Sequence, residues 1–162
     1  MNSYKVFIIV LLSGCLLAAC NPAPLYQKQE PIPQNAWSYN FKPSFAFDIV
    51  DTTTAYRPYF IIRHTQAYPY NNLWIWLYIK TPGDVVAKKA RVNITLAEPT
   101  GKWLGKGMGE IYEQRMPISL GDSINLSKRG TYQIEIEQNM RLNPLPEVLH
   151  VGLRIEKTTV RH

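Results

Sequence analysis

Cysteine is nearly absent from this chain of 162 residues: its two copies, Cys15 and Cys20, both lie near the N-terminus. No apolar run reaches the roughly 20 residues that a membrane-spanning helix needs. Histidine occurs only three times, and no His, Cys, Asp or Glu residues stand at the short fixed spacings typical of a metal site. These absences argue against a domain stapled by disulfides, a membrane-spanning helix and a metal centre.

Signatures of catalysis are missing as well. The chain shows no Ser/His/Asp signature, and His64 and His150 fit the ordinary role of surface or hydrogen-bonded residues on strands. Carboxylates that are near neighbours in sequence do not establish a pair that faces across a cleft. Two such pairs occur, Asp48 with Asp51 and Glu110 with Glu113. We therefore predict that the protein is not an enzyme and takes no cofactor.

A glycine-rich stretch at residues 101–109 (GKWLGKGMG) lacks the GxxxxGK(S/T) order of a phosphate-binding loop, and no helical pattern follows it. Glycine is also the residue that tolerates the backbone angles of bulges and tight turns. We interpret this stretch as a bulged loop.

The charge balance is basic but diffuse. The net charge is +6, and removal of a leader whose only charged residue is Lys5 lowers it to +5. Basic residues cluster only at Lys88-Lys89-Ala90-Arg91, whereas a nucleic-acid binder needs a basic stripe with exposed aromatics or a known module. The sequence therefore argues against a nucleic-acid partner.

The first residues have the features of an export signal. Lys5 precedes an apolar run that ends in small residues. Leu17-Ala18-Ala19-Cys20 matches a bacterial lipobox, in which the cysteine is acylated and becomes the first residue of the mature protein. Leu12-Ser13-Gly14-Cys15 fits the same pattern, but Cys20 follows the longer apolar core and precedes a polar segment. We predict a lipoprotein signal peptide at residues 1–19 and lipidation at Cys20; a Cys15–Cys20 disulfide is the alternative, and it requires that Cys15 be retained.

Residues 20–35 are predicted to form a tether. Residues 21–35 (NPAPLYQKQEPIPQN) contain four prolines, which prevent regular hydrogen bonding and favour an extended chain. Fully extended, such a segment reaches on the order of 45 Å. The folded domain is then expected at residues 36–162, which is enough chain for a single domain with a proper core.

From Ala36 onward the hydrophobic period is two, and no segment keeps a period of 3.6 for three turns. Side chains of a strand point alternately to opposite faces, so each such segment has one core face and one outer face. Turn sequences such as Thr81-Pro82-Gly83-Asp84 separate the segments. The clearest inward rows are Leu73, Ile75, Leu77 and Ile79; Val92, Ile94 and Leu96; Tyr132, Ile134 and Ile136; and Leu149, Val151, Leu153 and Ile155. The pattern predicts an all-β protein, an antiparallel β-sandwich of jelly-roll or Ig-like type with roughly seven to nine strands.

Aromatic residues are concentrated on the face opposite one of these rows. Trp74, Trp76 and Tyr78 alternate with Leu73, Ile75 and Leu77, so this strand has two apolar faces. The outer face is either covered by a second layer or loop, or it is a docking surface, because Trp and Tyr dominate interface hot spots. A platform for stacking carbohydrate is a third reading. The candidate partner-binding residues are Tyr68, Tyr70, Trp74, Trp76, Tyr78 and Trp103.

The same segments resemble the gliding-motility lipoprotein GldH family of Bacteroidetes, and the resemblance covers nearly the whole mature chain. Its blocks are Asp51-Thr52 with Tyr56, Arg63-His64, Tyr68-Pro69-Tyr70-Asn71-Asn72-Leu73-Trp74, Gly101-Lys102-Trp103-Leu104-Gly105 with Gly107 and Gly109, Gly130-Thr131-Tyr132, Glu137-Gln138-Asn139-Met140-Arg141 and Val151-Gly152-Leu153-Arg154-Ile155-Glu156-Lys157. The lipobox at Cys20 agrees with it.

The resemblance implies an envelope lipoprotein that is needed for surface gliding and linked to the type IX secretion apparatus. It carries over no catalytic residue, and relatives also occur in species that do not glide. The expected partners are the membrane, through the lipid anchor, and other envelope proteins of gliding or secretion; a small-molecule ligand is not favoured. A glycan- or peptidoglycan-binding module or hydrolase is the alternative.

The segment after Cys20 predicts the side of the membrane. Surface-displayed lipoproteins of Bacteroidetes generally carry acidic residues close to the lipidated cysteine, but here the first acid is Glu30. In some other bacteria an aspartate close after the lipidated cysteine retains lipoproteins in the inner membrane. Here Pro22 stands in that segment, and no such aspartate is present. We expect a lipid anchor in the outer membrane, with the domain facing the periplasm.

Mass spectrometry of the mature protein tests the anchor. We expect an acylated N-terminal Cys20, because two or three acyl chains bury enough methylene groups for stable anchoring, at about 0.8 kcal/mol each. An unmodified Cys20 within an intact leader, or acylation at Cys15, contradicts the prediction.

Overall fold

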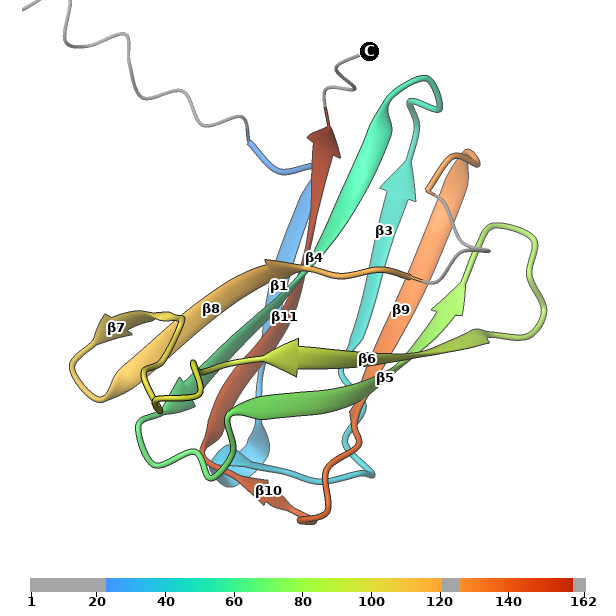
Figure 1. Ribbon diagram of the computed structural model, residues 1–162. Helices are drawn as coiled ribbons and strands as arrows, with labels where there is room; N and C mark the ends of the chain where they lie inside the picture. Colours follow the sequence, from blue (N-terminus) through green and yellow to red (C-terminus); the bar gives the residue numbers. More distant parts are fainter. Residues whose placement is uncertain (1–22, 121–125, 159–162) are drawn as a thin grey trace, which may run out of the picture.

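The computed structural model describes residues 23–120 and 126–158, and in these ranges the chain is built from antiparallel strands (Figure 1). This confirms the predicted all-β class. A 3₁₀ turn, η2 (Pro33–Asn35), is the one helical element in the described ranges. The strands are β1 (Tyr26–Pro31), β2 (Ala36–Trp37), β3 (Ser44–Ile49), β4 (Ala55–Thr65), β5 (Asn72–Lys80), β6 (Lys88–Thr95), β7 (Lys106–Met108), β8 (Ile111–Pro117), β9 (Gly130–Gln138), β10 (Leu145–Pro146) and β11 (Val148–Thr158).

The strands form two main sheets and a short two-stranded ladder. The five-stranded sheet has the order β1-β11-β4-β8-β7, the four-stranded sheet has the order β3-β9-β5-β6, and β10 pairs with β2. Neighbours in both main sheets are antiparallel. Their strands cross in the view of Figure 1, and the two layers give the sandwich-like arrangement that the sequence predicts.

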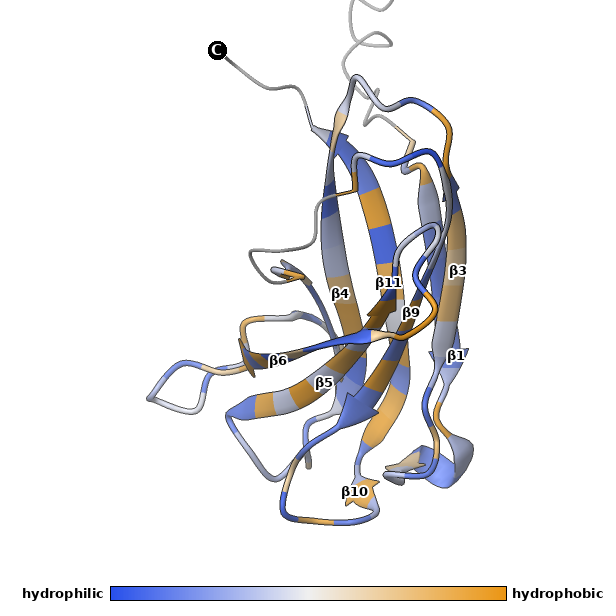
Figure 2. Cartoon of the chain, turned by 90° about the vertical axis from the view of Figure 1, so that its right-hand side faces the viewer, coloured by the Kyte–Doolittle hydropathy of each residue, from blue (hydrophilic) through white to orange (hydrophobic). Residues whose placement is uncertain are grey.

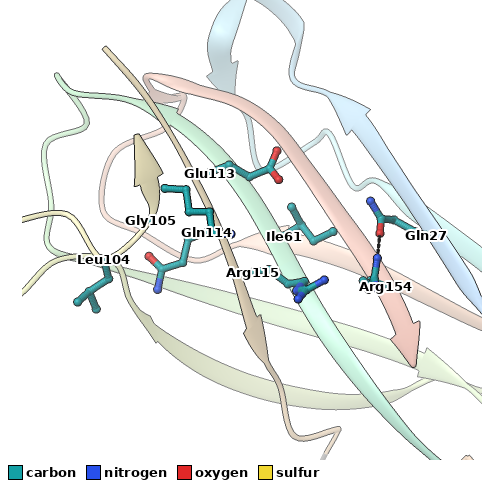
Figure 3. Close-up of a pocket in the computed structure, with 9 residues that line it drawn as sticks. Gln27, Ile61, Leu104, Gly105, Glu113, Gln114, Arg115 and Arg154 are labelled. Carbon is teal, nitrogen blue, oxygen red and sulfur yellow. Dashed lines mark hydrogen bonds between the residues drawn. The ribbon is translucent and has the colours of Figure 1, made fainter. Parts of the chain in front are cut away.

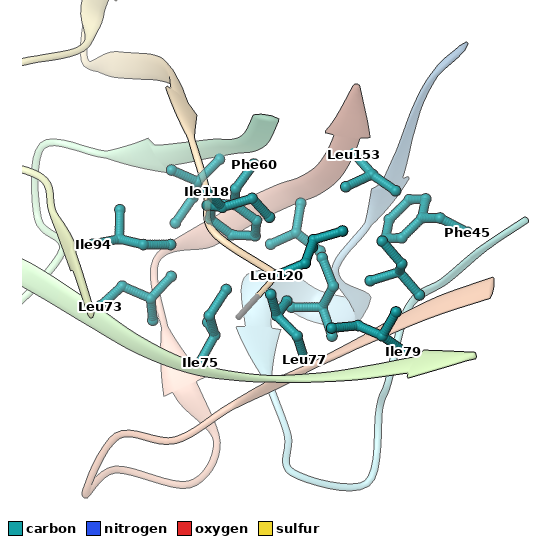
Figure 4. Packing of buried hydrophobic residues seen from close by; sticks show 14 of the residues in the cluster. Phe45, Phe60, Leu73, Ile75, Leu77, Ile79, Ile94, Ile118, Leu120 and Leu153 are labelled. Carbon is teal, nitrogen blue, oxygen red and sulfur yellow. The ribbon is translucent and has the colours of Figure 1, made fainter. Parts of the chain in front are cut away.

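The core lies between these two sheets. Leu73, Ile75, Leu77 and Ile79 are fully buried along β5, and Figure 4 shows them pointing toward Phe60 and Leu153 of the five-stranded sheet. Burial of each such side chain contributes roughly 1.5–3 kcal/mol, which makes this row a principal source of stability. The alternating hydrophobic and hydrophilic bands along β5, β9 and β11 are visible in Figure 2.

The turn between β5 and β6 has the predicted chemistry. The Asp84 N–H donates to the Thr81 carbonyl at 2.9 Å, and Gly83 has a φ of +90°. A positive φ at the third turn residue is characteristic of a type II turn, which glycine adopts without strain. The glycine-rich stretch also forms a loop with positive φ at Gly101 and Gly109, although it includes the short strand β7.

The predicted tether is wrong for residues 26–31. They form β1, which pairs with β11 along its whole length, from Tyr26 opposite Ile155 to Pro31 opposite His150. The prolines flank the ladder or end it, as expected for an edge strand. The Tyr26 ring also packs on Phe47 of the four-stranded sheet, with ring centroids 5.5 Å apart. The folded domain therefore begins about ten residues earlier than the sequence suggested.

The inward row predicted for the last strand also needs one correction. Val148 is fully buried whereas Leu149 is half-buried, because the pairing register with β4 shifts between Val148 and His150. Such a bulge adds one residue to a strand and reverses the alternation on one side of it. Val151, Leu153 and Ile155 are buried as predicted.

Gly152→Ala tests whether β1 is an integral strand. A Cβ at Gly152 would lie 2.6 Å from the backbone oxygen of Lys28, so β1 must move away. We expect a loss of roughly 1–3 kcal/mol in the free energy of unfolding, together with faster hydrogen exchange in β1. Urea denaturation and exchange mass spectrometry measure both effects.

Gly107→Ala is the matched control, because its Cβ would meet only the side-chain ring of Tyr112, at 3.1 Å. It should leave exchange in β1 unchanged. Wild-type exchange rates in β1 of the Gly152→Ala variant would show that β1 does not depend on this contact.

Candidate docking surface

The outer face of β5 carries a row of aromatic side chains. Trp74, Trp76 and Tyr78 are half-buried and alternate with the fully buried core row of the same strand. Their positions follow from the period of two, because a strand that buries Leu73, Ile75 and Leu77 must turn the intervening residues outward. We call this row, with the cations described next, the aromatic–cationic face.

Exposed cations lie against the aromatic rings. On β6, Arg91 pairs with Trp76 and Lys89 pairs with Tyr78. The Arg91 guanidinium carbon is 4.2 Å from the ring centroid of Trp74, and Lys89 Nζ is 4.0 Å from that of Trp76. Such contacts are attractive because the ring face carries partial negative charge. In the described part of the chain, neither Lys89 nor Arg91 forms a salt bridge.

The end of the row nearest Lys80 is fixed by a carboxylate. Glu137 of β9 accepts a hydrogen bond from the Tyr78 hydroxyl at 2.6 Å and pairs with Lys42 at 2.7 Å. Lys42 Nζ also lies 4.8 Å from the Tyr78 ring centroid. Although desolvation by burial acts to raise the pKa of Glu137, the hydrogen bonds from Lys42 and Tyr78 hold it below its usual value. This carboxylate is therefore ionised and engaged at neutral pH.

The other end of the row opens into a hollow of roughly 420 Å³. Asn139, with its side-chain oxygen facing the donors, accepts from Arg91 Nε at 3.0 Å and from Trp76 Nε1 at 3.3 Å. The backbone N–H of Trp74 donates to Met140 Sδ at 3.1 Å. The hollow is lined by Tyr70, Asn72, Trp74, Arg91, Asn139, Met140 and Arg141. It thus offers apolar surface, an amide and two guanidinium groups at one place.

The structure brings together four of the six residues that the sequence proposed for this surface. Trp74, Trp76 and Tyr78 form the row, and Tyr70 lines the hollow at its end. Cys20 lies outside the described residues.

Tyr68 and Trp103 do not belong to this face. Tyr68 is only 4% exposed, and its ring packs with those of Trp103 and His64. Burial raises the pKa of the Tyr68 hydroxyl, which donates to the Asn72 carbonyl at 3.1 Å. The prediction is wrong for Tyr68 because the turn before β5 directs it inward, which local sequence did not reveal.

Sequence reasoning missed the cations and the amide of the face. Lys89 and Arg91 were noted only as part of a charge cluster, yet the hairpin from β5 to β6 and the period of two place both beside the aromatic row. The position of these two cations beside the aromatic row could therefore have been predicted from the sequence. Lys42 and Asn139 come from segments that reach β5 only through the pairing of β9 with β3 and β5, so no local pattern points to them.

A second hollow, of roughly 470 Å³, lies on the outer face of the five-stranded sheet (Figure 3). Its arginines are already engaged: Arg154 donates to Gln27 and to Glu156, and Arg115 lies 3.4 Å from Glu156. Its one lining carboxylate, Glu113, pairs with Arg63 at 3.7 Å. Lys106 also lines this hollow and, among the described residues, is its one charged side chain without a salt bridge.

The carboxylates Glu110 and Glu113, which are close in sequence, face different hollows. Glu110 lines a third one, of roughly 420 Å³, together with Glu147, whose carboxylate accepts a hydrogen bond from Thr65 Oγ1. Within residues 23–120 and 126–158, no group of three or more His, Cys, Asp or Glu could hold a metal ion. In the same ranges no helix is long and apolar enough to cross a membrane.

The fold and the surface thus define the class of this protein: a small antiparallel β-sandwich with one aromatic–cationic outer face. The family model described as GldH lipoprotein matches residues 24–155. The chain belongs to the GldH lipoprotein family.

Two curated relatives carry related names. A protein of Christiangramia forsetii named "Gliding motility lipoprotein GldH homolog" is 29% identical over 97% of this chain and 98% of its own length. The "Gliding motility lipoprotein GldH" of Flavobacterium johnsoniae is 26% identical over 92% of this chain and 94% of its own. Among solved structures, a carbohydrate-binding module, CBM28, described as specific for non-crystalline cellulose, matches with a TM-score of 0.49 and 12% identity, over 87% of this chain and 78% of that one.

An internal aromatic cluster of His64, Tyr68, Trp103 and Tyr112 leads to a prediction about pH. His64 is fully buried, its Nδ1 lies 2.8 Å from the Thr65 carbonyl, and its Nε2 has no hydrogen-bond partner among the described residues. The carbonyl can only accept, so Nδ1 carries a proton, and burial disfavours a second proton on Nε2, which favours the neutral ring. Burial lowers the pKa of His64 in the folded state.

Below its usual pKa of about 6.5 the unfolded state therefore binds a proton that the folded state does not. The free energy of unfolding should fall as pH drops below about 6.5, with a limiting slope of about 1.4 kcal/mol per pH unit from this residue. His64→Asn should remove that slope, measured as the difference between urea denaturation at pH 7 and pH 5.5. Equal pH dependence in both proteins contradicts the prediction, whatever the stability of the variant.

Proposed function

We propose that this protein is a cell-envelope lipoprotein of the gliding-motility machinery that acts as a non-catalytic docking subunit linked to the type IX secretion apparatus. Cys20 carries the lipid anchor in the outer membrane, and the domain faces the periplasm. The names of the relatives in Christiangramia forsetii and Flavobacterium johnsoniae support the motility role. The absence of acidic residues between Cys20 and Glu30 supports the orientation.

The aromatic–cationic face carries the docking role. It combines a row of large half-buried rings with Arg91 and Lys89, which form no salt bridge in the described part of the chain. Trp, Tyr and Arg are the side chains enriched at the centre of protein interfaces. An acidic segment of an envelope protein is the partner that fits, because its carboxylates would pair with Lys89 and Arg91 where these cations lie over the rings. The hollow beside Trp74 supplies a place for one anchoring side chain.

The positions of the cations favour a protein over a sugar. Carbohydrate stacking uses the open face of an aromatic ring, but Arg91 lies over Trp74 and Lys89 over Trp76 at 4.2 and 4.0 Å from the ring centroids. A sugar would have to displace a favourable cation–π contact at each ring. An acidic protein segment would keep these contacts and add ion pairs to them.

Photo-crosslinking in native membranes tests the face. A photoreactive residue at Asn93, opposite Trp74 on β6, should capture a defined envelope protein, identified by mass spectrometry. The double change Trp74→Ala/Trp76→Ala should reduce that capture at least about tenfold, because truncation of hot-spot aromatics costs about 2 kcal/mol or more. The charge reversal Lys89→Glu/Arg91→Glu should do the same while it leaves the rings in place.

Tyr59→Ala is the matched control on the other sheet, where the half-buried Tyr59 ring has Arg115 at 5.6 Å from its centroid. It should leave capture unchanged. Undiminished capture by both face variants would falsify the docking role. A loss of gliding or of capture on Glu110→Gln/Glu147→Gln, with the face variants unaffected, would favour the hydrolase alternative.

A further inference from the structure

The connection between the lipid anchor and the fold is short. The chain is fixed from Leu25 onward, because its N–H donates to the Ile155 carbonyl at 2.9 Å and β1 follows at once. Five residue steps separate Leu25 from Cys20, and such a segment spans at most about 18 Å when extended. If Cys20 is acylated, as proposed above, the start of β1 cannot leave the membrane surface by more than this distance.

The start of β1 identifies one end of the sandwich, which we call the anchor end. It comprises Leu25, the loop at residues 50–54, residues 126–130 and Thr158. The strand registers place these segments together, since β4 starts opposite the end of β11 and β3 ends opposite the start of β9. Figure 1 shows all four strand ends at the upper end of the molecule, and β10 at the opposite end.

The anchor end has the chemistry of a surface that meets lipid headgroups. Val50 is 62% exposed and Leu25 is 38% exposed. Lys128, Arg129 and Lys157 are exposed around them.

The nearby carboxylates of the anchor end accept hydrogen bonds within the fold and keep their negative charge, and Asp51 is paired with Lys157, so Lys128 and Arg129 are the cations left for lipid headgroups. Asp51 accepts hydrogen bonds from Thr53 and Thr54 and lies 3.4 Å from Lys157. Asp48 accepts from Thr131, and Asp84 accepts from Thr81. Exposed apolar tips beside cations bind anionic bilayers by burial in the headgroup region and by attraction to the headgroups.

We propose that the anchor end docks on the lipid surface that holds the acyl chains, with Val50 and Leu25 in the headgroup layer and Lys128 and Arg129 over anionic headgroups. The short connection keeps this end at high local concentration at the membrane, so weak contacts suffice. β3 and β11 then stand upright on the bilayer, whereas β5 and β6 run across this direction (Figure 1). The aromatic–cationic face opens sideways, toward partners that lie beside the protein in the same membrane or close to it.

Fluorescence quenching by lipids tests the docking. The mature chain has no cysteine other than the acylated Cys20, so Val50→Cys and Leu142→Cys each give a single labelling site. Leu142 is the matched control, an exposed apolar residue (42%) in the loop that leads from β9 to β10 at the opposite end. The lipidated full-length mature protein is placed in vesicles of phosphatidylglycerol and phosphatidylethanolamine that contain brominated lipid.

We expect the label at position 50 to be quenched several-fold more than the label at position 142. Lys128→Glu/Arg129→Glu should lower the quenching at position 50 toward its value in vesicles without phosphatidylglycerol. Equal quenching at the two positions, or no quenching at position 50, overturns the proposal.

A longer segment between Cys20 and β1 distinguishes lipid binding by the anchor end from mere confinement of this end near the membrane. Twelve glycine and serine residues inserted between Asn21 and Pro22 should leave position 50 quenched at low salt, because the surface itself binds lipid. Loss of quenching in this variant overturns the proposal.

Two outcomes keep this inference apart from the proposed function. An unacylated Cys20 in mass spectrometry would refute the anchor on which both depend. An acylated protein with an unquenched position 50 that still captures its partner would refute only the lipid docking.

Discussion

The two main sheets are held together by apolar side chains that each central strand contributes from one of its faces. β5 shows the consequence most clearly, because the burial of Leu77 forces its neighbours Trp76 and Tyr78 to the outside. A register slip of one residue would exchange the two rows and place the Tyr78 hydroxyl in the core, away from Glu137. The constraint that builds the core therefore also fixes the composition of the outer face.

An outer row of two tryptophans and a tyrosine would be an aggregation liability if it were bare. Here the long side chains of Lys89 and Arg91 lie over the rings while their charges remain exposed. Cation–π contacts of this kind contribute about 0.5–1 kcal/mol each at exposed sites, and basic side chains commonly cover apolar surface with their aliphatic stems. The rings are thus partly covered in the free protein, and the positive charges of Lys89 and Arg91 remain available to an acidic partner.

The fold class and most strands could be predicted from the sequence because they depend on local alternation. The row from Leu73 to Ile79 and the turn at Thr81–Asp84 are found where the pattern placed them. The predictions failed where a distant contact overrides the local signal. β1 looked like a proline-rich tether until its pairing with β11 was known, and Leu149 is displaced by a bulge that only the ladder with β4 reveals.

The sequence by itself determined the all-β class, the family resemblance, the aromatic row and the position of the cysteine that fits a lipobox. Each of these features depends on residues that are neighbours along the chain, so it can be predicted from the period of two or from a short motif. Only the tertiary structure decided that Tyr68 is buried, that Lys42, Asn139 and Glu137 complete the face, and that the fold starts close to Cys20. These features depend on which strands pair across long gaps, as when Tyr26 pairs with Ile155 near the other end of the chain, and loop closure over such distances leaves no local pattern in the sequence.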